Sequence, residues 1–276
     1  MREVPPSAVA GAYRDAAQNG AGHALLEISD VGMRFGGIVA LEAVSFSVAK
    51  GRIVGLIGPN GAGKTTLFNC LNRIYRPARG EIRLSGRSLG RCAPSDIAAL
   101  GVGRTFQAST LFASMSVLDN VKVGAHARGR NGPLIDAVTL PRARGEEREV
   151  ERISRAMLAF VGLEGMAARP AASLALGLRK RVELARALAG QPSLLLLDEP
   201  AGGLNHEEVA GLATLIRSIR DQLGITVLLV EHHMGLVMSL SDQVVVLNFG
   251  RVIADGSPDE VRGNPVVAEA YLGTRQ

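Results

Sequence analysis

The stretch that decides the fold reads Gly58-Pro59-Asn60-Gly61-Ala62-Gly63-Lys64-Thr65. It fits the pattern G-x-x-x-x-G-K-[ST] and lies between a short apolar run at 53–57 and a segment of helical composition at 64–74. Glycines allow successive backbone N–H groups to turn inward around a phosphate, and the N-terminus of the following helix adds partial positive charge. The strand–loop–helix context therefore predicts a phosphate-binding loop that ends a buried strand.

The last residues of this stretch predict the kind of phosphate that it binds. Lys64 is placed to reach the β- and γ-phosphates of a nucleotide, and the Thr65 hydroxyl is placed to ligate Mg²⁺. We count Thr66, the next residue, with the same site. The predicted cofactors are therefore ATP and Mg²⁺.

A second polar group follows another buried run. Residues 194–197 are four leucines, and Asp198 and Glu199 come directly after them. At the end of a strand beside a phosphate loop, Asp198 would hold Mg²⁺ through its hydration shell. Glu199 would stand beside the γ-phosphate and orient or deprotonate a water molecule. An Asp-Glu pair at a strand end is common by chance, so this prediction depends on the phosphate loop.

Working outward from these motifs, apolar runs and helical patterns alternate along the chain. Strands are predicted at 25–31, 40–48, 53–57, 82–84, 194–197, 226–230 and 244–247, and a turn at Gly36-Gly37. Helices are predicted at 64–74, 117–127, 146–161, 178–189 and 207–223, with a loop at 129–145. Strands without polar alternation indicate a parallel sheet covered on both faces. The helical middle of the chain is then an insertion in an α/β core.

Composition limits the class of protein. The chain has 276 residues, of which 47 % are hydrophobic and 21 % charged, and this excludes a disordered chain. Two cysteines cannot build a disulfide framework, and no apolar stretch is long enough to span a membrane. The net charge of +5 arises mostly from scattered arginines, and aromatic residues make up only 4 %. We therefore expect no nucleic-acid partner.

With these motifs in order, the sequence resembles the nucleotide-binding subunit of an ABC transporter, from about residue 25 to residue 272. The resemblance implies that Phe35 stacks on adenine and that Gln107, a glutamine loop residue, joins the metal site to a helical subdomain. It also implies that His232 contacts the γ-phosphate, and that residues 201–205 form the D-loop. Alone, Phe35 would more simply be a core residue and His232 a buried structural histidine.

The family's signature motif, L-S-G-G-Q before a helix, is altered in this chain. The corresponding residues are Leu174, Ala175, Leu176, Gly177 and Leu178. The Ser hydroxyl and the Gln amide are missing, whereas a glycine and the helix N-terminus remain to meet a γ-phosphate. The resemblance implies that the signature segment faces the nucleotide of a second cassette. We therefore expect weak ATP-driven dimerisation of the isolated chain.

Further matches point to a subclass. Residues 104–107, 199–205 and the tail at 264–273 resemble cassettes of branched-chain or other hydrophobic amino acid importers. Cassettes for amides or urea are the main alternative. The resemblance implies membrane-spanning permease subunits, a second cassette (identical or paralogous) and, indirectly, a substrate-binding protein as partners. It places the chain at the cytoplasmic face of the inner membrane as a peripheral subunit.

We therefore predict an α/β P-loop ATPase core with a mixed β-sheet, a small antiparallel β portion and an inserted helical subdomain. Residues 1–23 are predicted to be a flexible extension, and residues 24–272 a single ATP-binding domain. Its helical subdomain would span about 108–190, and 273–276 would form the C-terminal end. Three rivals stay open: a soluble ABC-type ATPase acting on nucleic acid or the ribosome, a P-loop kinase or GTPase, and a regulatory subunit that binds ATP without hydrolysing it. An N-K-x-D guanine motif is absent, which disfavours the GTPase.

Overall fold

Two β-sheets carry the fold in the computed structural model, which describes residues 24–105, 111–126 and 140–272. The larger sheet has six strands in the order β10-β9-β3-β8-β7-β6. Neighbouring strands from β9 to β6 run parallel, and β10 pairs antiparallel with β9. Its strands are β3 (Ile53–Ile57), β6 (Val102–Arg104), β7 (Leu194–Asp198), β8 (Thr226–Val230), β9 (Gln243–Asn248) and β10 (Arg251–Gly256).

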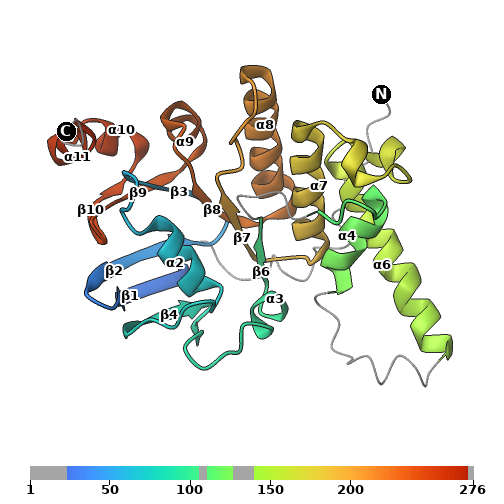
Figure 1. Ribbon diagram of the computed structural model, residues 1–276, viewed down its shortest axis with the longest axis horizontal. Helices are drawn as coiled ribbons and strands as arrows, with labels where there is room; N and C mark the ends of the chain where they lie inside the picture. Colours follow the sequence, from blue (N-terminus) through green and yellow to red (C-terminus); the bar gives the residue numbers. More distant parts are fainter. Residues whose placement is uncertain (1–23, 106–110, 127–139, 273–276) are drawn as a thin grey trace.

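The smaller sheet is antiparallel, with the order β2-β1-β4-β5, and lies at the lower left of Figure 1. Its long hairpin turns at Gly36, which has a positive φ of 57°. The alternation of buried and exposed residues in β2 matches a sheet with one face on the core. Its strands are β1 (Ala24–Phe35), β2 (Ile38–Ala49), β4 (Arg79–Leu84) and β5 (Arg87–Ser88).

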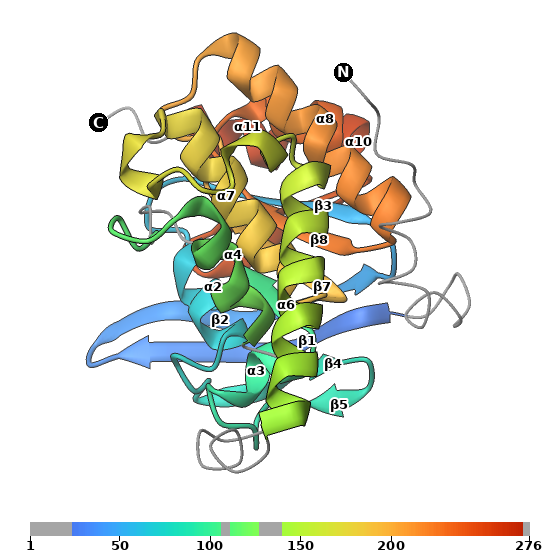
Figure 2. The same cartoon turned by 90° about the vertical axis from the view of Figure 1, so that its right-hand side faces the viewer.

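Helices cover the larger sheet and build a separate group beside it. Helices α4, α6 and α7 lie together on the right of Figure 1, and Figure 2 shows α6 running alongside the other two. The α-helices are α2 (Lys64–Leu71), α3 (Asp96–Ala99), α4 (Val117–His126), α6 (Leu140–Phe160), α7 (Leu176–Ala189), α8 (His206–Leu223), α9 (Met234–Leu240), α10 (Pro258–Arg262) and α11 (Pro265–Leu272). Short 3₁₀ turns occur at η2 (Glu164–Met166) and η3 (Ala171–Ser173).

Complete burial explains why the sequences of the three central strands are apolar throughout. Every residue of β3, β7 and β8 is buried, because helices pack on both faces of the sheet. Their uninterrupted apolar sequences are those of strands without a solvent face. The carboxyl ends of these parallel strands meet at one edge, and that edge holds the polar motifs.

Most of the predicted elements are confirmed, with shifted ends. The helix predicted at 64–74 ends at Leu71, and the strand predicted at 25–31 continues to Phe35. The loop prediction for 129–145 is wrong in its last part, because α6 begins at Leu140. Charged residues along α6 form the expected helix pair between Arg155 and Glu151, at 2.8 Å. The predicted extension at 1–23 and the end at 273–276 lie outside the described residues.

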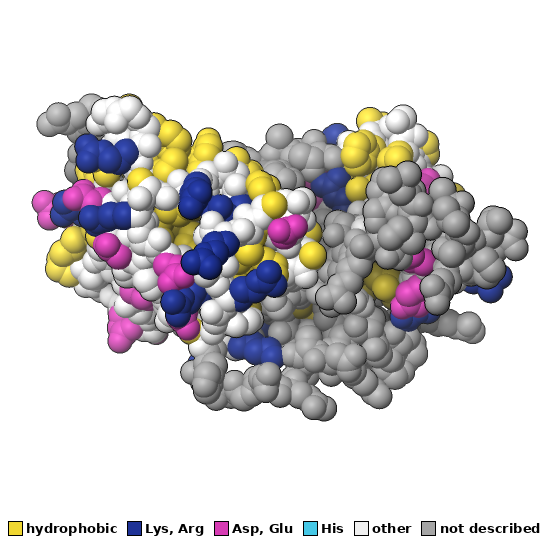
Figure 3. All heavy atoms as spheres, turned by 90° about the horizontal axis from the view of Figure 1, so that it is seen from below, with side chains coloured by type: hydrophobic (Ala, Val, Ile, Leu, Met, Phe, Trp, Pro, Cys, Tyr) yellow, Lys and Arg dark blue, Asp and Glu magenta, His cyan; other side chains and the backbone are white. Residues whose placement is uncertain are grey.

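Two surface properties bear on the expected partners. No helix of the described residues is both long and apolar enough to cross a bilayer. In the face seen in Figure 3, lysines and arginines alternate with acidic side chains over the half that holds the antiparallel sheet. The described part of this face therefore carries charges of both signs.

Candidate nucleotide site

The phosphate-binding loop joins the buried strand β3 to helix α2, which begins at Lys64. Gly63 has a φ of 103°, and a Cβ atom there would lie 2.6 Å from the Ala40 carbonyl oxygen. Only glycine fits this position without displacing the hairpin strand beneath the loop. The N-terminus of α2 has no side-chain cap, and its first turn has no acidic residue. Its partial positive charge is therefore not offset locally and favours an anion.

Lys64 is buried and folded back onto the loop. Its Nζ donates to the Gly58 carbonyl at 2.6 Å and to the Pro59 carbonyl at 3.0 Å. Burial lowers the pKa of Lys64, whereas the nearby carboxylates of Glu199 and Asp198 raise it. Thr65 next to it is exposed at the mouth of the loop. The ammonium group is thus held by carbonyl oxygens that a phosphate oxygen can replace.

Asp198 ends strand β7 in a buried ion pair that the sequence did not predict. Its Oδ2 lies 2.8 Å from Arg104 Nη2, and the two side chains are only 5 % and 8 % exposed. Arg104 comes from β6, the neighbouring parallel strand. The same guanidinium donates to Asn69 Oδ1 at 3.0 Å and lies 5.8 Å from the centre of the Phe68 ring. Arg104 therefore ties the carboxylate to the helix of the phosphate loop.

Glu199 and His232 face each other across the ends of β7 and β8. Glu199 Oε1 lies 2.7 Å from His232 Nε2, and the Glu199 N–H donates to the Val230 carbonyl at 2.9 Å. Glu199 has a φ of 49°, a strained conformation for a residue with a side chain, which occurs often at functional sites. The predicted base and the predicted phosphate sensor thus form one hydrogen-bonded pair. His233, the next residue, is exposed.

Glu231 is a further residue that the sequence analysis missed. It is buried, and its Oε1 accepts from the Ala201 N–H at 2.6 Å while its Oε2 accepts from the His232 N–H at 3.1 Å. One carboxylate therefore ties the segment after Glu199 to the segment that carries His232. The sequence did contain a signal for Glu231, because its carboxylate stands directly between an apolar strand and the candidate His232.

Two further predicted site residues, Phe35 and Gln107, come from other segments of the chain. Phe35 ends β1 half-exposed, and its ring meets Tyr75 edge to face with centroids 5.1 Å apart. Gln107 lies outside the described residues. The structure brings the loop at 58–65 close to Asp198, because Arg104 joins Asp198 to Asn69 of helix α2, the helix that begins at Lys64.

The signature segment, Leu174 to Leu178, surrounds the start of helix α7. Ala175 is the N-cap residue and makes no side-chain cap bond, and the first turn holds no acidic residue. A Cβ atom at Gly177 would lie 2.5 Å from Glu208 Oε1, so α7 packs closely against the start of α8. In Figure 1 this helix stands with the helical group, whereas α2 stands on the side of the antiparallel sheet. Within one copy, the signature helix and the phosphate loop therefore belong to different parts of the molecule.

Comparison with known proteins agrees with this geometry. A family model described as "ABC transporter" matches residues 41–202, and one described as "Branched-chain amino acid ATP-binding cassette transporter" matches residues 251–276. The high-affinity branched-chain amino acid transport ATP-binding protein BraF of Pseudomonas aeruginosa is 44 % identical over 90 % of this chain and 98 % of its own length. The corresponding protein LivG of Escherichia coli is 42 % identical over 90 % of this chain and 98 % of its own length.

A solved structure shows the same fold. The ADP conformation of an ATP-binding cassette of an ABC transporter superposes with a TM-score of 0.79 at 30 % identity. The match covers 91 % of this chain and 99 % of that cassette. The predicted fold class and the predicted ATPase activity are therefore confirmed: the chain belongs to the ABC transporter family, as one of its ATP-hydrolysing, ATP-binding subunits.

Proposed function

We propose that this chain hydrolyses ATP to power a membrane importer of branched-chain amino acids. Two observations support the cargo: the relatives of nearly full length are named for branched-chain amino acid transport, and a tail model of that subclass matches residues 251–276. The cargo would bind elsewhere, in a substrate-binding protein and in the permease, so the proposal for it depends on these relatives.

The observation that carries the ATPase mechanism is the convergence of Lys64, Asp198, Glu199 and His232 at one edge of the sheet. On this proposal, the loop N–H groups and the N-terminus of α2 bind the phosphates of ATP. Lys64 leaves the carbonyls of Gly58 and Pro59 and donates to the β- and γ-phosphates. Phe35 supplies an aromatic face for adenine at the end of β1.

Glu199 and His232 would share the work at the γ-phosphate. Glu199 is partly buried and accepts a proton from, or orients, the attacking water. His232 Nε2 holds the Glu199 carboxylate in place at 2.7 Å and turns to the γ-phosphate when nucleotide binds. Glu231 fixes the backbone of His232, so that the exposed ring is presented from a rigid segment.

The residues present fit Mg²⁺ carried by a nucleotide. The described residues contain no cluster of three His, Cys, Asp or Glu side chains that could hold a metal alone. Thr65 and Asp198 supply hard oxygen donors, and Mg²⁺ in such sites takes its other ligands from phosphates and water. Thr65, Asp198 and Gln107 would hold the ion, and bound Mg²⁺ would neutralise charge that develops on the phosphates. Arg104 pairs with Asp198 at 2.8 Å and orients its carboxylate before the nucleotide arrives.

A second cassette would complete each site. The uncapped start of α7, with an exposed Leu176, offers backbone N–H groups to a γ-phosphate bound by the partner copy. The Ser hydroxyl and Gln amide of the usual signature are replaced by Ala175 and Leu178, which removes two polar contacts. Dimerisation of the isolated chain is accordingly weak on this proposal, and the permease holds the two cassettes together.

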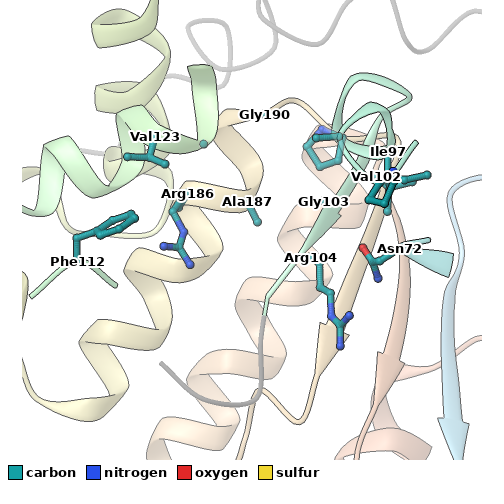
Figure 4. Close-up of a pocket in the computed structure, with 14 residues that line it drawn as sticks. Asn72, Ile97, Val102, Gly103, Arg104, Phe112, Val123, Arg186, Ala187 and Gly190 are labelled. Carbon is teal, nitrogen blue, oxygen red and sulfur yellow. The ribbon is translucent and has the colours of Figure 1, made fainter. Parts of the chain in front are cut away.

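The permease would dock in a cavity of about 440 Å³ between the core and the helical group. Figure 4 shows Phe112, Val123 and Arg186 on one wall and Ile97 and Arg104 on the other. A largely apolar cleft with a few charged groups fits a short amphipathic helix of a partner. Because Arg104 also pairs with Asp198, a displacement of Asp198 would move Arg104 and so change this wall of the cavity.

A chain docked in this way is a peripheral subunit on the cytoplasmic face of the membrane. Residues about 108–190 act as its helical subdomain.

Uptake of radiolabelled leucine in cells tests the proposal. Deletion of the coding gene is expected to abolish ATP-dependent leucine uptake, and the wild-type chain is expected to restore it. Glu199→Gln, expressed at the same level, is the matched control and is expected to restore none. Unchanged leucine uptake in the deletion strain, with loss of amide or sugar uptake instead, would contradict the proposed cargo.

A further inference from the structure

Asn120 is a buried polar residue whose side-chain hydrogen bonds reach back to the loop before its own helix. It lies in the first turn of α4, and its Oδ1 accepts from the Phe112 N–H at 2.8 Å. Its Nδ2 donates to the Phe112 carbonyl at 3.0 Å and to the Ser116 carbonyl at 2.9 Å. One amide side chain thus holds both backbone polar groups of Phe112 and closes the loop at 112–116.

The loop closed by Asn120 carries an exposed aromatic ring. Phe112 is 49 % exposed, and it lines the cavity of about 440 Å³ between the core and the helical group. In Figure 4 it lies on the same wall of this cavity as Val123 and Arg186. Aromatic side chains are enriched at the centres of protein interfaces, where they fill apolar pockets of the partner. Phe112 is therefore suited to anchor a partner in this cavity.

The wall that carries Phe112 is also fixed to the signature helix α7. The Ala171 N–H donates to the Met115 carbonyl at 3.0 Å, which ties the loop to the segment just before the signature residues. A Cβ atom at Gly124 would collide with the Arg186 carbonyl, so α4 and α7 pack backbone against backbone. A partner held by Phe112 is consequently held by the same group of helices that carries the signature segment.

A ring that is already in place binds more tightly than the same ring on a mobile loop. Ordering of a loop on binding costs conformational entropy, and an anchor that is fixed beforehand avoids that cost. The three hydrogen bonds of Asn120 fix the backbone of Phe112 in this way while the ring stays exposed. The simpler role of Asn120 is to satisfy the polar groups of the loop for folding alone, and the two roles differ in their consequences for binding.

We propose that Phe112 anchors an apolar side chain of the permease helix, and that Asn120 is the positioning residue that presents its ring. This inference rests on the proposed docking of the permease in this cavity. It narrows the partner to a helix with an apolar side chain that faces Phe112 and Val123. Asn120 is buried and acts through Phe112 without touching the partner.

Binding of the nucleotide-free full chain to its cognate permease in lipid nanodiscs tests the inference, with empty nanodiscs as the blank. Phe112→Ala removes the ring and is expected to weaken binding about tenfold or more. Asn120→Leu removes the three hydrogen bonds at similar size and is expected to weaken binding about fivefold. Met115→Ala changes an exposed residue of the same loop outside the cavity lining; as the matched control, it is expected to bind within twofold of the wild type.

A double-substitution cycle separates positioning from a purely structural role. If Asn120 acts through Phe112, adding Asn120→Leu to Phe112→Ala is expected to weaken binding by less than a further twofold. A further fivefold loss, as for two independent sites, would overturn the role of Asn120. Near-normal binding by Phe112→Ala would overturn the role of the anchor.

Folding and docking are checked separately. Asn120→Leu is expected to leave ATP binding by the isolated chain within twofold, and Asn120→Ala replaces it if that chain does not fold. Loss of the fold in both variants would make Asn120 a residue of the fold alone and overturn the proposal. A wild-type chain that does not bind the permease, or binds empty nanodiscs equally well, would contradict the proposed docking itself.

Discussion

Replacement of Arg104 tests how strongly the buried ion pair holds the metal-binding aspartate. The Arg104–Asp198 pair has an N–O distance of 2.8 Å, with side chains 8 % and 5 % exposed. Two unit charges about 4 Å apart interact by about 4 kcal/mol at an effective dielectric constant of about 20. Removal of one partner of a buried pair typically costs about 3–5 kcal/mol, because the other charge stays buried without compensation. Arg104→Met is therefore expected to lower the free energy of unfolding by about 3–5 kcal/mol.

Urea unfolding of the nucleotide-free chain, followed by circular dichroism, measures this loss. Arg83→Met is the matched control, because the Arg83–Glu81 pair has the same 2.8 Å distance but side chains that are 50 % and 40 % exposed. Its loss is expected to be too small to resolve. Adding Asp198→Asn to Arg104→Met removes the buried carboxylate charge that has lost its ion-pair partner and is expected to restore part of the stability. The reasoning is refuted if Arg104→Met costs no more than Arg83→Met, or if the second substitution only adds a further loss.

Three further experiments test the site and the interior around it. Glu199→Gln is expected to keep ATP binding and to slow hydrolysis by about a hundredfold or more, since it removes the group that orients or deprotonates water; near-normal turnover would exclude that role. Ala175→Ser with Leu178→Gln is expected to strengthen ATP-driven dimerisation, at about 1 kcal/mol per hydrogen bond, as measured by light scattering; tight wild-type dimers that do not change in the variant would refute this. Burial raises the pKa of Cys70 to about 11, so its thiol stays protonated, and Cys70 in the folded chain is expected to resist thiol reagents at pH 8 until the chain is unfolded, as mass mapping of the modified residue would show.

The parts of the fold that could be predicted are those in which local sequence and burial agree. Strands β3, β7 and β8 are apolar throughout because both of their faces are covered. Helix α8 begins with a capping box between Asn205 and Glu208, a local signal that fixes its start. The glycine pattern of the phosphate loop is likewise dictated by backbone geometry, as the close approach at Gly63 shows.

The parts that were missed depend on partners far away in the sequence. Strand β6 has three residues and only one of them is buried, so it has no periodicity to detect. Strand β10 lies at the sheet edge and carries partly exposed residues in place of an apolar run. Arg104 and Asp198 are 94 positions apart, and no pattern in either segment predicts that they meet. The role of Glu231 also arises only when separate segments are packed together.

The central claim is that ATP hydrolysis at this site powers import of branched-chain amino acids, and reconstitution tests it most directly. The chain would be incorporated into liposomes with its cognate permease, and its ATPase rate measured with the substrate-binding protein empty or loaded with leucine, a short amide, urea or a sugar. A loaded binding protein favours the closed cassette pair through the permease and so raises the ATPase rate. We predict severalfold stimulation by leucine that is absent with the Glu199→Gln chain. Stimulation by the sugar, the amide or urea without stimulation by leucine would contradict the claim.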